Sequence, residues 1–380
     1  MINGLSASPW PASSDEDIPS GGGATSVAVV RELSRLDELS DAWDLLAARS
    51  GSPLHQYAWI RACAASFLTD RELHFFVAGT APRITAIAPL IGRRRRGCSL
   101  QLIAADELYE PMDFLCAVPD ALDLLAEALA RSGHALLLKR IPSDSPVIAA
   151  LRRSFRGRGV VICRPVPGCP WIPLDSGWME PEQRLNPGRR SDFRRARRIA
   201  ERMGPVRSEV LSPAPARLEP LLEEAFRVEA SSWKGRDGTA LADDPARGLF
   251  YRRYATAACK KGILRVCFLR IGGRAAAMQL AVECAGRFWL LKIGYDQEFQ
   301  RCSPGILLIR ETVRYAAARG LRGYEFLGIV EPWTEAWTDE VRPCVSVRAY
   351  PARWAGVAAL AVDLADYARR RLGRAGRAKR

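Results

Sequence analysis

Residues 287–328 read RFWLLKIGYDQEFQRCSPGILLIRETVRYAAARGLRGYEFLG, and this stretch decides the fold. The apolar run 287–293 is followed by a glycine and predicts a buried strand. Ser303 suits a helix N-cap and Pro304 the first helical position, and the apolar residues that follow have helical spacing. Gly320 ends that helix, and a second strand is predicted at its far end, so the unit is strand, loop, helix, strand.

The loop before the predicted helix has the composition of an anion site. The free N–H groups and the positive dipole end of a helix attract phosphate. Gly305 would let a ligand approach the backbone, and Arg301 adds a positive charge beside it. A simple cap followed by a turn gives the same pattern, so the loop alone does not decide between the two interpretations. Upstream, residues 263–270 and 275–283 predict two more strands, joined by a Gly-Gly hairpin turn.

Three segments together carry a family resemblance. KIGYDQEFQRCSPGILLI, with EASSWKG upstream and GYEFLG downstream, resembles the GNAT acetyltransferase superfamily. The branch it resembles is associated with bacterial cellulose and exopolysaccharide synthesis and is related to the Fem peptidoglycan aminoacyltransferases. QRCSPG lies where the superfamily carries a Gln/Arg-x-x-Gly-x-Gly/Ala pyrophosphate loop, of which only the last glycine, Gly305, is kept. The resemblance covers roughly residues 25–350.

The resemblance implies an α/β (α+β) fold of tandem GNAT-like domains, with mixed, mostly antiparallel sheets flanked by helices. The first half of the chain shows strands and helices in a comparable order, without a convincing sequence repeat. The proline-rich residues 165–171 mark the approximate join, and residues 172–175 follow as a possible edge strand. The predicted divisions are a disordered segment at 1–24, domains at 25–175 and 176–350, and an amphipathic helix with a basic tail at 351–380.

Composition sets limits on class and partners. The 380 residues, 48% hydrophobic and 26% charged, suffice for two globular domains. The net charge of +14 is concentrated at residues 93–96, 189–198 and 369–380, which would attract polyanions or simply form a solvated basic surface. Scattered cysteines and three histidines give no metal framework, so we expect no metal site. We expect a cytoplasmic protein that could contact the inner membrane or a synthase through its last helix.

The resemblance also implies where chemistry would occur. Backbone N–H groups of the strand before the loop polarise the thioester carbonyl, which points to Leu290, Leu291, Lys292 and Ile293. Glu229 is the first candidate base, because neighbouring Trp233 and Lys234 would partly desolvate it; a surface carboxylate paired with Lys234 is the alternative. Asp296, the second candidate, could instead form a turn, and Tyr295 could protonate the thiolate or only pack. Glu325 could face the cleft or pair with an arginine.

Further residues are candidates for binding. Arg301, Ser303 and Gly305 would hold the phosphates of the donor. Four arginines of the helix predicted at 187–203 could hold the phosphates of coenzyme A or of a nucleotide-linked sugar, or form only a solvated helix face: Arg189, Arg190, Arg194 and Arg198. Trp233, Trp333 and Trp337 could stack on a sugar or cap a core, and Lys234 is a further candidate for substrate binding.

The predicted function is therefore acyl transfer, of an acetyl or longer group, from coenzyme A to an amine or hydroxyl of a cell-surface polysaccharide precursor. Acetyl-CoA would be a co-substrate, with no permanently bound cofactor. One alternative is a Fem-like transferase that draws on aminoacyl-tRNA; the long heptad segment typical of such proteins is missing here, so we do not expect a nucleic-acid partner. Another is a catalytically degenerate scaffold for a membrane polysaccharide synthase.

Overall fold

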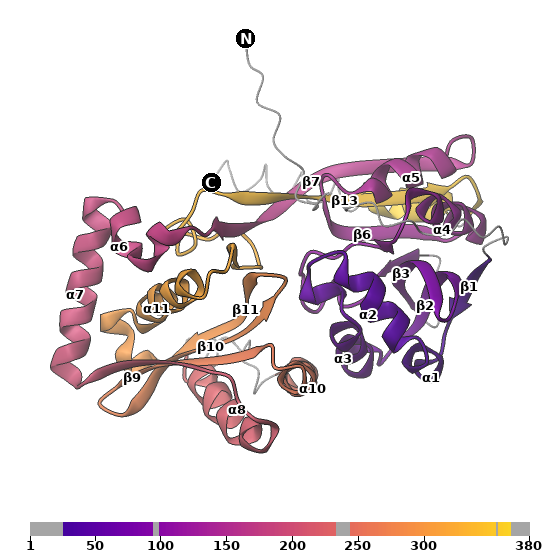
Figure 1. Ribbon diagram of the computed structural model, residues 1–380. Coiled ribbons are helices and arrows are strands. Elements are labelled where there is room, and N and C mark those ends of the chain that lie inside the picture. The colour runs from indigo at the N-terminus through magenta and orange to yellow at the C-terminus, as the bar shows by residue number, and fades with distance from the viewer. Residues whose placement is uncertain (1–25, 94–98, 233–243, 355, 366–380) are drawn as a thin grey trace, which may run out of the picture.

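A computed structural model describes residues 26–93, 99–232, 244–354 and 356–365 (Figure 1). The candidate site residues Trp233 and Lys234 lie outside these ranges, as do the predicted disordered segment 1–24 and residues 366–380 of the tail. Within the described ranges, no helix is long and apolar enough to cross a membrane.

The first half of the chain forms a mostly antiparallel sheet covered by helices. Its elements are β1 Val27–Val30, α1 Leu33–Asp37, α2 Ser40–Ala48, η1 Pro53–His55, α3 Tyr57–Phe67, β2 Arg71–Thr80, β3 Arg83–Arg93, β4 Ser99–Leu102, β5 Leu115–Cys116, α4 Pro119–Ser132, β6 Ala135–Pro142, α5 Pro146–Ser154 and β7 Gly159–Pro173. β1 to β4 pair antiparallel in chain order, and β6 returns parallel to β4 after the crossover helix α4.

The second half repeats this order. Its elements are η2 Ser176–Met179, α6 Pro181–Arg184, α7 Pro187–Met203, β8 Val206–Leu211, α8 Pro215–Ala230, α10 Pro245–Lys260, β9 Leu264–Ile271, β10 Arg274–Cys284, β11 Arg287–Tyr295, η3 Gln297–Cys302, α11 Pro304–Ala318, β12 Gly323–Glu325 and β13 Val341–Pro351. β8 to β11 pair antiparallel, and β12 returns parallel to β11 after α11. Gly272 and Gly273 both have positive φ, as the predicted two-residue hairpin turn requires.

The two halves exchange their last strands. β7, from the first half, pairs antiparallel with β12 of the second half. β13, from the end of the chain, pairs antiparallel with β6 of the first half and with most of β7. The described strands thereby form a continuous order from β1 to β8 through the β13–β7 ribbon, which spans the top of Figure 1. This exchange ties the halves together and sets β12 beside β11.

The path of β7 differs from the sequence prediction. The proline-rich residues 165–171 are not a break but part of one strand of 15 residues, and residues 171–173 pair with β12 inside the sheet instead of forming an edge. β7 is paired with β13 up to Pro170 and with β12 only from Trp171, so most of its length has one ladder neighbour. Proline lacks a backbone donor and is tolerated where one side of a strand is unpaired.

A shared apolar core joins the halves. Trp59 of α3 packs edge-on against Phe250 and Tyr254 of α10, with ring centroids 4.9 and 4.8 Å apart, and the two helices lie side by side in Figure 1. A second cluster fills the space between α11 and its sheet and contains Phe288, Leu308 and Tyr324. The fold class predicted from the sequence is confirmed: a mixed, mostly antiparallel α/β sheet flanked by helices.

The connection that follows the fourth antiparallel strand differs between the two halves. In the first half, the connection after β4 turns inward, and Ile103, Met112, Phe114 and Leu115 are buried in the main core. In the second half, the equivalent connection after β11 is a short 3-10 helix, η3, which leaves the start of α11 accessible. Among the described residues, the second half therefore has a cavity at this position, whereas the corresponding connection of the first half is packed into the core.

Candidate functional site

The parallel strands of the second half separate before β11 ends. β12 pairs with β11 only as far as Trp289, whereas β10 accompanies β11 to Tyr295. A β-bulge within the β10–β11 ladder leaves Leu291 as the extra residue and increases the local twist. The backbone of β11 beyond Trp289 consequently borders a gap that β12 does not close.

The helix that faces this gap begins differently from the prediction. Ser303 precedes α11, but its φ of 45° and ψ of 56° are left-handed, and its side chain makes no capping hydrogen bond. Its carbonyl instead accepts hydrogen bonds from the amides of Ile306 and Leu307, at 3.0 and 3.2 Å. Among the described residues, the amide of Gly305 has no protein partner. The turn therefore presents a free N–H at the positive end of the helix, where an anion is favoured.

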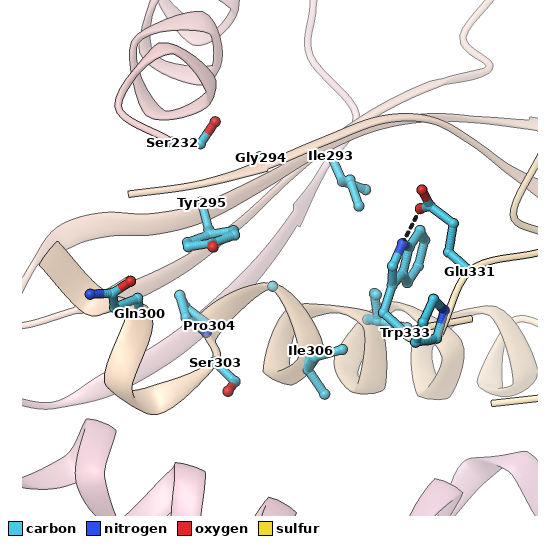
Figure 2. A pocket seen from close by; sticks show the side chains of 13 residues that line it. Ser232, Ile293, Gly294, Tyr295, Gln300, Ser303, Pro304, Ile306, Glu331 and Trp333 are labelled. Atoms are coloured by element: carbon cyan, nitrogen blue, oxygen red, sulfur yellow. Dashed lines mark hydrogen bonds between the residues drawn. The ribbon is translucent and has the colours of Figure 1, made fainter. Parts of the chain in front are cut away.

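A cavity of about 620 Å³ lies between β11, the start of α11 and the loop at residues 331–333; we call it the β11–α11 cavity. Figure 2 shows Tyr295 from β11 and Trp333 from the loop on either side of the first turn of α11. Its lining is formed by Ser232, Ile293, Gly294, Tyr295, Gln300, Ser303, Pro304, Gly305, Ile306, Ile309, Glu331, Pro332 and Trp333. Its size and largely apolar wall are those of a small-molecule site.

Only part of the predicted donor contact set lines this cavity. Ile293, Ser303 and Gly305 do so. Leu290 is buried in the core beneath α11, and Lys292 faces α8 on the other side of the strand. The backbone carbonyl of Leu291, the bulge residue, accepts a hydrogen bond from the hydroxyl of Tyr251, a residue of α10 that sequence reasoning did not single out, at 3.1 Å.

Glu229 is neither at the surface nor among the lining residues. It is fully buried, and its Oε1 lies 2.9 Å from Nζ of Lys292. Gly294 of β11 lies close against the backbone of α8, where only glycine fits, because a Cβ at this position would lie 2.7 Å from Cα of Glu229. Lys292 thus forms an ion pair with Glu229, and this pair fixes α8 against the bulged part of β11.

The other candidates for proton transfer have distinct surroundings. Tyr295 lines the cavity. Asp296 acts as the cap of η3: its carboxylate accepts a hydrogen bond from the amide of Glu298 at 3.0 Å and lies 3.3 Å from Arg274. Glu325 is buried and forms a bidentate pair with Arg342, 2.7 Å at its shortest. The geometry of Asp296 and Glu325 is that of structural carboxylates.

The arginine-rich helix α7 presents only some of the expected arginines to the site. Arg194 and Arg198 are exposed and do not line the β11–α11 cavity. Arg189, which was predicted from the sequence, and Arg195, which was not, line an adjoining groove of about 490 Å³ together with Arg301. The groove also contains Ser303 and Ile306, which it shares with the cavity. Asn186 caps α7 as predicted, by accepting a hydrogen bond from the amide of Arg189 at 2.9 Å.

The tryptophans separate into two roles. Trp337 is buried and packs edge-on against Phe193 of α7, with centroids 5.4 Å apart, so it belongs to the core. Trp333 lines the cavity, and its indole N–H donates to the carboxylate of Glu331 (Figure 2). Glu331 is the single carboxylate among the described lining residues, and sequence reasoning missed it. Its position two residues before Trp333 was the available signal.

Comparisons with known proteins agree with this architecture. The sequence model of a family described as "Acetyltransferase (GNAT) domain" matches residues 187–335, and a search of curated proteins finds no match. The C-terminal domain of a putative lysylphosphatidylglycerol synthetase from Agrobacterium fabrum is similar over 87% of this chain and 96% of its own, with 12% identity and a TM-score of 0.54. FemX is similar over 82% of this chain and 96% of its own, with 12% identity and a TM-score of 0.53.

A third solved structure has the same fold. A conserved protein of unknown function from Bacteroides thetaiotaomicron covers 85% of this chain and 99% of its own, with 10% identity and a TM-score of 0.51. These likenesses show the fold alone. Residues 187–335, which match the acetyltransferase family model, contain β9 to β12 and the residues that line the β11–α11 cavity.

Proposed function

We propose that the protein is an acyltransferase that binds an acyl-coenzyme A thioester in the β11–α11 cavity and transfers the acyl group to an amine or hydroxyl. One observation carries this proposal: the cavity opens where β11 and β12 part, at the start of α11, within the residues that match the acetyltransferase family. The thioester would lie along the unpaired edge of β11, and its diphosphate would face the amide of Gly305.

The adjoining groove suits the nucleotide end of the donor. Arg189 and Arg301 line it and make no ion pair within the described part of the chain, whereas Arg195 lies 3.4 Å from Asp192. Unpaired guanidinium groups are well suited to phosphate. Since groove and cavity share Ser303 and Ile306, one extended ligand could occupy both.

The lining supplies groups for the chemical step. The acceptor nitrogen or oxygen would attack the thioester carbonyl carbon and give up its proton to Glu331, while the C–S bond breaks and the phenol of Tyr295 protonates the departing thiolate. Backbone N–H groups of β11 would stabilise the negative charge that develops on the carbonyl oxygen. The Glu229–Lys292 pair then has a positioning role, because it holds the bulged strand that carries these N–H groups.

A saccharide precursor is the acceptor we favour. The indole of Trp333 is only half-buried at the cavity and is held in place by Glu331 and by edge-on packing against Phe326, with centroids 5.7 Å apart. An oriented indole face suits a sugar ring. Of the three predicted stacking tryptophans, this is the one for which the described structure supports the role.

Calorimetric titration of acetyl-CoA tests the donor site. Gly305 has no positive φ, and a Cβ there would meet only Cδ1 of Tyr295 at 3.9 Å, so the fold accepts alanine or valine. We expect Gly305→Val to weaken acetyl-CoA binding about tenfold or more by blocking close approach to the backbone, with Gly305→Ala in between.

The chain contains a matched control for this substitution. Gly188 also follows a proline at the second position of a helix, and its Cβ would make ordinary contact with Asn186 at 3.4 Å. Gly188→Val should leave acetyl-CoA affinity unchanged. Equal affinity of the Gly305 and Gly188 variants would refute the loop assignment, and a wild-type protein that binds no acyl-CoA would favour the scaffold alternative.

An aminoacyl donor is the second candidate. It is supported by the similarity to FemX and to a putative lysylphosphatidylglycerol synthetase domain, and by the exposed arginines of α7. A tRNA ligand would bind with an affinity that falls steeply with salt and would require Arg194 and Arg198, which are exposed and do not line the cavity.

A further inference from the structure

The helix after β13 turns its charged side chain toward the protein and its large apolar side chains toward solvent. Trp354 and residues 356–365 are helical, and the single charged side chain in this stretch, Asp363, points toward the protein. Its carboxylate lies 2.7 Å from the guanidinium of Arg348 and accepts a hydrogen bond from the hydroxyl of Tyr350, both on β13. The charge therefore anchors the inner side of the helix.

The outer side of the same helix is apolar. Trp354 is 87% exposed, Val362 62%, Val357 52% and Leu364 49%. The exposed residues between them are alanines 358, 361 and 365. A surface helix normally turns its charged side to water and its apolar side to the core. A continuous apolar face in the opposite direction marks a binding surface.

The sequence that follows identifies the chemistry of the partner. Residues 367–380 contain seven arginines and lysines and no acidic residue. Apolar insertion beside a basic segment is the combination that binds an anionic lipid surface, where tryptophan sits at the level of the headgroups. The outer face carries one aromatic side chain, Trp354, among aliphatic side chains and alanines, which suits the soft interior of a lipid leaflet better than a shaped protein groove.

We propose that the helix formed by Trp354 and residues 356–365 lies on an anionic membrane surface, with Trp354, Val357 and Leu364 inserted below the headgroups. Asp363 would keep the helix attached to β13, so the whole protein would be held at the membrane. This proposal is independent of the acyltransferase reaction.

Co-sedimentation with vesicles tests it on the full-length protein. We expect binding to vesicles that contain phosphatidylglycerol, weak binding to vesicles of phosphatidylcholine alone, and loss of binding at high salt. The double variant Val357→Glu/Leu364→Glu should reduce binding to the anionic vesicles about tenfold or more. Because both side chains are exposed, the variant should keep the melting temperature of the wild type.

A matched control uses an apolar residue elsewhere. Leu45 on α2 is 74% exposed, and Leu45→Glu adds the same kind of charge without touching the helix. This variant should bind vesicles like the wild type. The proposal is overturned if the wild type sediments with neither vesicle, if Leu45→Glu weakens binding as much as the double variant does, or if the helix substitutions instead abolish a dimer seen by light scattering.

Discussion

At the scale of single residues, the proposed reaction depends on Glu331 as the proton acceptor. Glutamine at this position would keep an acceptor oxygen for the Trp333 indole but could not take up a proton. We expect Glu331→Gln to lower kcat about 100-fold or more in a coupled thiol-release assay, with the KM for acetyl-CoA changed by less than about twofold. Glu335, exposed in the same loop and absent from the cavity lining, is the control: Glu335→Gln should retain full kcat. Equal kcat values for the two variants would remove Glu331 from the mechanism.

At the scale of elements, the buried Glu229–Lys292 pair connects α8 to β11. Lys292→Met would remove the ammonium group that lies 2.9 Å from this buried carboxylate, and we expect urea unfolding to show a loss of about 3 kcal/mol in the free energy of unfolding. The double variant Glu229→Gln/Lys292→Met removes both charges and should recover most of this stability. If Glu229 only positions the strand, turnover should recover with stability. Turnover that stays low in a stable double variant would instead identify Glu229 as a base.

Elements with local signals were predictable from the sequence. The Asn186 cap and Gly204 delimit α7 as expected, and the Gly272-Gly273 turn joins β9 and β10. The prediction for residues 165–175 was wrong because it depends on strands that are distant in the sequence. β7 continues through its prolines because it pairs with β13 and β12. Ser303 and Gly305, which were predicted from the loop sequence, line the cavity. The pairing of Glu229 with Lys292 and the position of Glu331 at the cavity arise only when separate elements pack together.

At the scale of the whole molecule, a carboxyl group bridges the two halves. Glu110, in the connection after β4, accepts a hydrogen bond from the amide of Gly328 at 3.0 Å, just beyond β12. The guanidinium of Arg140 on β6 donates to the carbonyl of the same glycine. Burial raises the pKa of Glu110 to about 7. The junction that positions β12 beside the cavity therefore contains a group that titrates near neutral pH.

This raised pKa makes the stability of the junction depend on pH. The pKa of Glu110 is about 7 in the folded protein and 4.5 in the unfolded chain, so the folded state binds this proton more tightly. The stability that protonated Glu110 contributes is therefore complete below about pH 4.5 and is lost as the pH rises through 7. Glu110→Gln cannot titrate. From pH 5 to pH 8, the free energy of unfolding of the wild type should therefore fall by about 2 kcal/mol relative to the variant, a discounted value because the side chain keeps some contact with solvent.

Two other buried groups cancel in this difference because both proteins contain them. Burial raises the pKa of Asp113 to about 7 and lowers the pKa of His55 to about 4. Urea unfolding curves of the two proteins that shift by the same amount with pH would contradict the prediction. Glu110 would then ionise in the folded protein as it does in the unfolded chain, and the other hydrogen bonds of the junction would hold it together.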